Sequence, residues 1–206
     1  MTVPPGRRAR KKAATRQKIA DTALQLFLEH GYDAVGIRDV AAAADVAVTT
    51  LFSHFASKEA LVFEQDENFE QRLTRAVTDR VPEEPLIPAL RREIHAQVRH
   101  CVAADGGAEI WNLIDESPGL RKYEESMRLR HAESLATAIA ADLDLPEPTT
   151  ACRAIARFVI DVHSLAREAA DPEAAVDEIF RMIEAAWKII QVDPPRGARS
   201  PSRGGR

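Results

Sequence analysis

Residues 48–54 place small and polar side chains on one side of a short predicted helix, with basic residues before and after it. A helix with such a face can enter the major groove of DNA and contact base edges. Arg38 begins the preceding helical segment, where its guanidinium can reach a guanine edge or a phosphate, and Lys58 is placed to bind a phosphate. The residues expected to contact DNA are Arg38, Val48, Thr49, Thr50, Phe52, Ser53, His54 and Lys58.

Two short helices joined by a tight turn have to hold these side chains. Small apolar residues along 37–44 let a second helix, 47–55, cross it closely, and Leu51 and Phe55 anchor that second helix. Asp45 occupies the turn, where the backbone often becomes left-handed, and Asp is among the few residues besides Gly that tolerate this conformation. The spacing indicates a helix-turn-helix, although plain helical bundles contain similar pairs.

The charge of the chain is distributed unevenly along the sequence. The net charge is −4, yet the segment 7–18 carries seven Lys or Arg residues and no acidic residue. A basic segment on an acidic body is typical of a protein that binds nucleic acid with one end. A solubilising tail is the alternative interpretation.

Helical spacing recurs along the whole 206-residue chain, and no alternating strand pattern is found. We therefore expect an all-α protein of about nine helices, with an N-terminal three-helix helix-turn-helix domain and a C-terminal helical domain. Thr15 is expected to cap the first helix, and Ser57 to cap one continuous helix that ends near Arg80. The expected divisions are a disordered basic arm (1–14), the DNA-binding domain (15–60), an effector-binding and dimerisation domain (61–192) and a disordered tail (193–206).

Residues 15–61 resemble the DNA-binding region of tetracycline-repressor (TetR) family transcription regulators. The matching run is TRQKIADTALQLFLEHGYDAVGIRDVAAAADVAVTTLFSHFASKEAL, and its most specific parts are LFLEHGYDAV, IRDVAAAADV and TLFSHFASKEAL. The resemblance implies a homodimer on a palindromic operator in double-stranded DNA, and a repressor rather than an activator. It also implies a small-molecule effector bound by the C-terminal helices.

Several positions depart from the usual family pattern. Asp45 replaces a common Gly, and Ala47 and Gly36 stand where side chains that cap a helix are common. A missing capping side chain costs a helix about 1 kcal/mol. Phe52 replaces a common Tyr, so a phenol–phosphate hydrogen bond is lost. We expect altered affinity and base preference on an intact fold.

The last two predicted helices, 149–170 and 173–192, have apolar faces wider than one internal contact needs. Two copies of the chain can therefore pair through them as a four-helix bundle. The alternative is that both faces serve the core of one chain. The expected dimer-interface residues are Ile155, Val162, Ile179, Ile183 and Trp187.

The middle helices are expected to form an effector pocket, although most large apolar residues of a helical protein simply belong to its core. Such a lining predicts an effector that is at least partly hydrophobic, since a charged ligand needs a buried partner. The expected lining residues are Phe69, Leu73, Ile110, Trp111, Leu120, Tyr123, Met127 and Phe158.

Other kinds of chemistry find no support in the sequence. Its histidines lack metal-ligand spacing, and no catalytic triad, phosphate loop or paired carboxylates occur, so we expect no enzyme, no metal and no cofactor. Two cysteines, 51 positions apart, and no apolar run long enough to span a bilayer predict a cytoplasmic protein without a membrane partner. Two rival functions are an effector-independent architectural DNA-binding protein and a helical ligand carrier or enzyme with a vestigial DNA-binding region.

Overall fold

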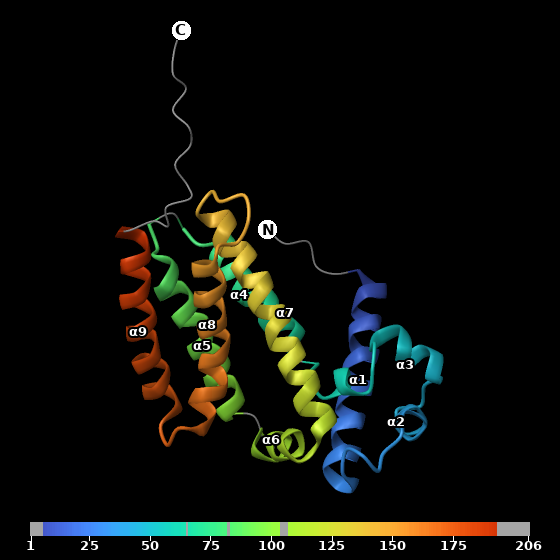
Figure 1. Cartoon of the computed structure of the whole chain (residues 1–206). Coiled ribbons are helices and arrows are strands. Elements are labelled where there is room, and N and C mark those ends of the chain that lie inside the picture. Colours follow the sequence, from blue (N-terminus) through green and yellow to red (C-terminus); the bar gives the residue numbers. More distant parts are fainter. Residues whose placement is uncertain (1–5, 65, 82, 104–106, 193–206) are drawn as a thin grey trace. The chain divides into compact units, whose positions relative to one another are not determined.

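The computed structural model describes residues 6–64, 66–81, 83–103 and 107–192 (Figure 1). These residues form helices and contain no strand, which confirms the predicted all-α class. The expected tail, 193–206, and residues 1–5 lie outside the described residues. The helices are α1 (Arg7–His30), α2 (Ile37–Ala43), α3 (Val48–His54), the 3₁₀ helix η1 (Glu59–Leu61), α4 (Asp66–Thr78), α5 (Leu86–Ala103), α6 (Gly107–Glu116), α7 (Pro118–Asp142), α8 (Thr150–Glu168) and α9 (Pro172–Val192).

The chain divides into two units, each with its own internal packing. Unit 1 combines the chain up to Phe69 with residues 103–127, and unit 2 combines residues 70–102 with the chain from Arg128 onward. Unit 1 is larger than the expected DNA-binding domain, 15–60. It includes α6 and the first part of α7 because their apolar side chains belong to its core.

The first helix starts earlier than the sequence pattern predicted. α1 begins at Arg7, so residues 7–14 of the expected basic arm are helical. Thr15 does not cap this helix; its hydroxyl donates to the carbonyl of Lys11, at 3.0 Å. The physical reason is composition, because residues 7–14 are all Arg, Lys or Ala, which are among the strongest helix formers.

The continuous helix predicted from Ser57 to Arg80 is also wrong. The structure has η1, a turn and then α4, and the Ser57 hydroxyl accepts a hydrogen bond from the amide of Ala60. Leu61 and Phe63 are both buried in the same core. Residues two positions apart point to different sides of an α-helix, so the chain has to leave the helical path to bury both.

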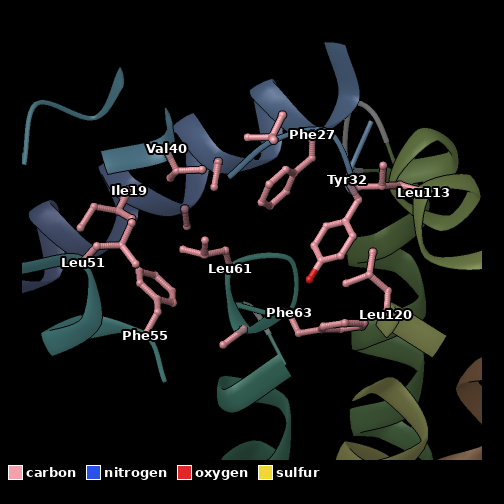
Figure 2. Packing of buried hydrophobic residues seen from close by; sticks show 14 of the residues in the cluster. Ile19, Phe27, Tyr32, Val40, Leu51, Phe55, Leu61, Phe63, Leu113 and Leu120 are labelled. Carbon is pink, nitrogen blue, oxygen red and sulfur yellow. The ribbon is translucent and has the colours of Figure 1, made fainter. Parts of the chain in front are cut away.

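The core of unit 1 joins the three N-terminal helices to α6 and α7 (Figure 2). Ile19, Leu51 and Phe55 meet on one side of this cluster, where α1 packs against α3. On the other side, Phe63 stacks on Tyr123 of α7 with 5.5 Å between ring centroids. Segments on either side of residues 70–102 in the sequence therefore share one hydrophobic core.

The turn between α2 and α3 has the left-handed geometry that the sequence predicted. Asp45 has φ 54°, which confirms its assignment to a left-handed position. The amide of Val46 donates to the carbonyl of Ala41 at 2.9 Å, and that of Asp45 donates to Ala42 at 3.1 Å. This pair of bonds is a Schellman motif, which ends α2 and sets the direction in which α3 leaves.

Unit 2 contains α5, α8, α9 and parts of α4 and α7, and α8 lies beside α9 (Figure 1). Ile155, Val162, Ile183 and Trp187 are almost fully buried inside this single chain. Four of the five residues expected at a dimer interface therefore belong to the core of unit 2, which was the alternative interpretation. Only Ile179 is partly exposed. Helical spacing identifies an apolar side but does not say whether the same chain or a second copy covers it.

Candidate nucleic-acid interface

The second helix of the helix-turn-helix, α3, buries one side and exposes the other. Leu51 is fully buried and Val48 packs against the core of unit 1. Thr49, Phe52 and Ser53 are exposed, and Phe52 keeps 51% of its surface accessible. The structure thus brings these three predicted contact residues together on one open face.

Two hydroxyl groups of α3 differ in how they are used. Ser53 donates its hydroxyl hydrogen to the carbonyl of Thr50 at 2.6 Å, which leaves its oxygen as an acceptor. Thr50 itself is partly buried, whereas Thr49 is exposed. Ala47, at the N-cap, provides no side-chain bond, as its residue type predicts. The exposed hydroxyls can therefore read base edges, but the helix begins without the usual side-chain cap.

Arg38 is exposed on the first turn of α2, where the sequence placed it. It forms no ion pair or hydrogen bond with any residue that the structure describes. The amide of Gly36 donates to the Asp39 carboxylate at 2.8 Å, so Asp39 ties down the start of α2 in place of a capping side chain. The Arg38 guanidinium keeps its planar set of donors available for a phosphate or a guanine.

Lys58 was predicted to bind a phosphate, but the structure shows that it also holds unit 1 together. Its ammonium group donates to the carbonyl of Tyr32 and lies 4.0 Å from the centroid of the Tyr32 ring and 5.5 Å from that of Phe27. Burial lowers the pKa of Lys58. The residue therefore links the loop after α3 to the connection between α1 and α2.

Two partners of Lys58 were missed from the sequence. Burial raises the pKa of Tyr32, and the charge of Glu59 together with a hydrogen bond to it adds to this effect. Burial of Glu59 opposes its ionisation, but hydrogen bonds from Ser57, from a backbone amide and from Tyr32, together with the charge of Lys58, outweigh burial and lower its pKa. The phenol, the carboxylate and the ammonium form a small polar network next to the hydrophobic core. The adjacency of Lys58 and Glu59 is visible in the sequence, but their common partner Tyr32 is not.

Arg16 is the most important residue that sequence reasoning missed, because the sequence analysis treated it only as one of the seven basic residues of the segment 7–18. Its guanidinium pairs with the Glu64 carboxylate at 2.6 and 2.8 Å and donates to the carbonyl of His54, the last residue of α3. It also lies 4.4 Å from the centroid of the Phe55 ring. A position three residues before buried Ile19 is the sequence signal for this inward orientation.

The residues expected to line an effector pocket are divided between the two units. Phe69 and Leu73 are buried on α4, one in each unit, and Phe158 is 56% exposed on α8. The other five lie in or against the core of unit 1, which they share with the DNA-binding helices. These five are Ile110, Trp111, Leu120, Tyr123 and Met127.

A cavity of about 320 Å³ in unit 2 has charged walls instead. Arg72 on its wall pairs with Glu93 at 2.7 Å, Arg92 pairs with Glu84, and Arg80 pairs with Asp142 at 2.5 Å.

Across the described ranges, no three His, Cys, Asp or Glu side chains come together as a metal site. None of the helices described there is long and apolar enough to cross a membrane.

The exposed face of α3, the Schellman turn before it and Arg38 on α2 are the features of a DNA-binding helix-turn-helix. A match over residues 19–64 and a regulator 30% identical over 68% of this chain together show that the chain belongs to the TetR family of bacterial transcriptional regulators. Residues 19–64 match the family described as "Bacterial regulatory proteins, tetR family". The family is one of DNA-binding regulators and not of enzymes, and this chain is accordingly a DNA-binding transcription regulator.

Similarity to known regulators extends beyond the DNA-binding segment. The chain is 30% identical over 151 residues to the HTH-type transcriptional regulator TcmR of Streptomyces glaucescens. This alignment covers 68% of this chain and 67% of TcmR. It is 30% identical over 144 residues to the HTH-type transcriptional repressor Rv3405c of Mycobacterium tuberculosis, covering 68% and 75%. Among solved structures, NalD, a repressor of a multidrug efflux pump in Pseudomonas aeruginosa, has a TM-score of 0.56 at 18% identity and covers 86% of this chain and 97% of NalD. This last likeness shows the fold.

Proposed function

We propose that this protein represses transcription as a homodimer on a palindromic operator and that a small molecule releases it from DNA. One chain carries one DNA-reading helix, α3, and a palindrome needs two such helices in a symmetric pair. Relatives such as Rv3405c are named repressors. A regulator of this kind acts where chromosomal DNA lies, so we place it in the cytoplasm.

The observation that carries the dimer is that α8 and α9, which pack side by side, each expose large apolar side chains, and we call this set the strip. Phe158, Leu165 and Met182 are 56%, 51% and 68% exposed. Phe158 and Leu165 are seven residues apart and so share one side of α8, and Ile179 adds a partly exposed side chain on α9 near Met182. Large exposed apolar residues on neighbouring helices are typical of protein interfaces, where Phe and Met are enriched.

The proposed effector acts through the part of unit 1 that is distant in sequence from α3. α6 and the start of α7 contribute Leu113, Leu120 and Tyr123 to the core that also holds Phe27 and Leu51. α7 continues without a break into unit 2. A ligand that favours one arrangement of α6 and α7 therefore changes the population of DNA-binding conformations, up to the limit set by its differential affinity.

Selection of bound duplexes from a random DNA pool, with the full chain, tests the operator. We expect enrichment of a palindrome with two equal half-sites about one helical turn or a small number of turns apart. Enrichment of a single, unrepeated site would contradict the dimeric proposal. Absence of any enrichment would favour the architectural alternative.

Compounds that release the selected operator test the effector, with the two tryptophans as reporters. Trp111 lies on α6 and Trp187 lies in the interior of unit 2 on α9. In Trp187→Phe most of the ligand-induced fluorescence change should remain, and in Trp111→Phe most of it should disappear. A signal that follows Trp187 instead would mean that the effector acts on α8 and α9.

A further inference from the structure

The charged cavity of unit 2 is lined by one side of α4, by the segment that follows α4 and by α5. Four of its lining residues have the spacing i, i+3, i+4 and i+7, which places them on the same side of a helix. These four are Arg72, Arg75, Ala76 and Asp79. Ala76 has only a methyl group, so it leaves space between its longer neighbours. The other lining residues are Arg80, Val81, Glu84, Arg92 and Glu93.

Arg75 differs from the other three arginines that line this cavity. Those three form the ion pairs described above. The guanidinium of Arg75 is exposed and forms no ion pair or hydrogen bond with a residue that the structure describes. The acid four residues further along is Asp79, whose carboxylate accepts the hydroxyl of Thr78 at 2.9 Å instead. Within the described part of the chain, the charge of Arg75 is therefore available to a ligand.

Arg80 adds a buried donor that lacks an acceptor. Its side chain is 16% exposed, and its terminal nitrogens donate to the carbonyl of Glu84 at 2.7 Å and to the carboxylate of Asp142 at 2.5 Å. Its Nε is buried and has no hydrogen-bond partner among the residues that the structure describes. Buried polar groups of folded proteins are nearly always hydrogen-bonded, and an unsatisfied one is unfavourable. An anion bound in the cavity would offer the acceptor that this group lacks.

We propose that this cavity binds a small anion through Arg75 and Arg80, with a carboxylate or phosphate group as the part that they recognise. The planar donors of a guanidinium match the oxygens of both groups. The volume of about 320 Å³ lies at the small end of ligand pockets, which span about 300–1,000 Å³. The inference goes beyond the proposed function, because the cavity contains none of the residues expected to contact DNA or to line the effector pocket.

Isothermal titration calorimetry of the full chain without DNA tests the site, with citrate and pyrophosphate as probes at about 0.15 M salt to screen weak surface attraction. We expect at least one probe to bind with one site per chain. Arg75→Gln should weaken this binding at least about tenfold, because it removes a charge-assisted hydrogen bond. Arg157→Gln is the matched control and should bind like the unchanged protein. Arg157, on α8, is also exposed and forms no ion pair with a described residue, but it does not line the cavity.

A third variant, Ala76→Leu, keeps every charge of the cavity but fills its space, so it should also weaken binding at least about tenfold. Circular dichroism shows whether the three variants are folded. Binding of citrate alone would identify carboxylates as the ligand class, and binding of pyrophosphate alone would identify phosphates. The inference is overturned if neither probe binds the unchanged protein, if Arg75→Gln and Arg157→Gln weaken binding equally, or if a folded Ala76→Leu binds normally. The result does not depend on the operator, because no DNA is present.

Discussion

Two aspartates hold left-handed backbone positions that usually favour glycine. Asp45 has φ 54° after α2, and Asp144 has φ 55° after α7. Asp tolerates this region better than most residues because its short side chain can hydrogen-bond locally. Each aspartate ends a helix in the same way, so the same substitution can be compared in both units.

At Asp45 we expect opposite effects from two small substitutions. Asp45→Ala should lower the free energy of unfolding by about 1 kcal/mol, because Ala has a Cβ and no polar group to offset left-handed strain. Asp45→Gly should keep or raise the free energy of unfolding, by up to about 1 kcal/mol. Urea denaturation measures both, and the same pair at Asp144 is the control for unit 2. An Ala variant as stable as the Gly variant would contradict the left-handed assignment.

The titration of His163 makes unit 2 sensitive to acid. Burial, together with the charges of Arg167 and Arg128, lowers the pKa of His163 to about 4. Its Nε2 lies 3.5 Å from the thiol sulfur of Cys101. The folded protein therefore keeps this imidazole neutral down to pH of about 4, whereas in the unfolded chain it takes up a proton below pH of about 6.5.

The sign of the pH dependence follows from this difference. Between pH of about 6.5 and 4 the unfolded state binds more protons, so the free energy of unfolding falls as the pH falls. His163 accounts for up to about 3 kcal/mol of that loss. In His163→Gln the urea midpoint should depend less on pH over this window, with His131 unchanged in both proteins as an internal reference. An equally steep dependence in the variant would show that other groups cause the acid sensitivity.

Among the elements, α6 and the start of α7 belong structurally to the DNA-binding helices. Leu120 of α7 is fully buried in the unit 1 core, and Leu90 of α5 is fully buried in unit 2. Replacing either leucine by Ala leaves a cavity that costs about 2–5 kcal/mol. The two variants are therefore matched in chemistry and differ in the unit that they weaken.

We expect Leu120→Ala to speed amide hydrogen exchange in α1 and α3, although these helices precede it by more than sixty residues. Leu90→Ala should speed exchange in the helices of unit 2 and leave α1 and α3 nearly unchanged. Hydrogen exchange followed by mass spectrometry resolves the helices. Equal effects of both variants on α3 would show that the two cores unfold as one.

The sequence predicted the two short helices, 37–44 and 47–55, and the last two helices, 149–170 and 173–192, to within a few residues, and Gly and Pro residues mark many helix ends. Gly31 follows α1 with a positive φ, and Pro118 and Pro172 begin α7 and α9. Two assignments of site residues depended on periodicity alone, which shows that a side is apolar but not what covers it. For that reason Ile155 was assigned to a dimer interface and Trp111 to a pocket, while both pack within a unit core. Arg16 was missed because its partner Glu64 is distant in sequence.

At the scale of the whole molecule, one charged substitution in the exposed strip on α8 and α9 tests whether the protein forms a dimer through it. Phe158→Asp should turn the dimer into a monomer, because an unpaired carboxylate in a dry interface costs several kcal/mol. Operator binding should fall strongly with it, since a monomer spans only one half-site. Sedimentation equilibrium measures the mass directly. Leu129→Asp is the matched control, because Leu129 is 53% exposed on α7, outside the strip.

A Leu129→Asp variant that dissociates as completely as Phe158→Asp would mean that the charge acts on folding rather than on the strip. A Phe158→Asp variant that stays dimeric would place the interface on another surface. A monomer still carries one α3 and can bind a single half-site weakly. The position of the dimer interface is therefore tested separately from the ability of α3 to bind DNA.

The contacts of Arg16 with Glu64, with the carbonyl of His54 and with the ring of Phe55 form a clamp across unit 1. This clamp affects attempts to engineer new DNA specificity. Arg16 joins the end of α3 to Glu64, which lies 48 positions after Arg16 in the sequence. The helix-turn-helix therefore depends on residues outside its own segment. A graft that transfers only residues 37–55 into another regulator carries His54 and Phe55 with it. It does not carry Arg16 and Glu64, which hold them in this protein. Chimeric regulators built from this protein should therefore transfer residues 16 to 64 as one module, or use hosts that already carry an arginine and a glutamate at these two positions.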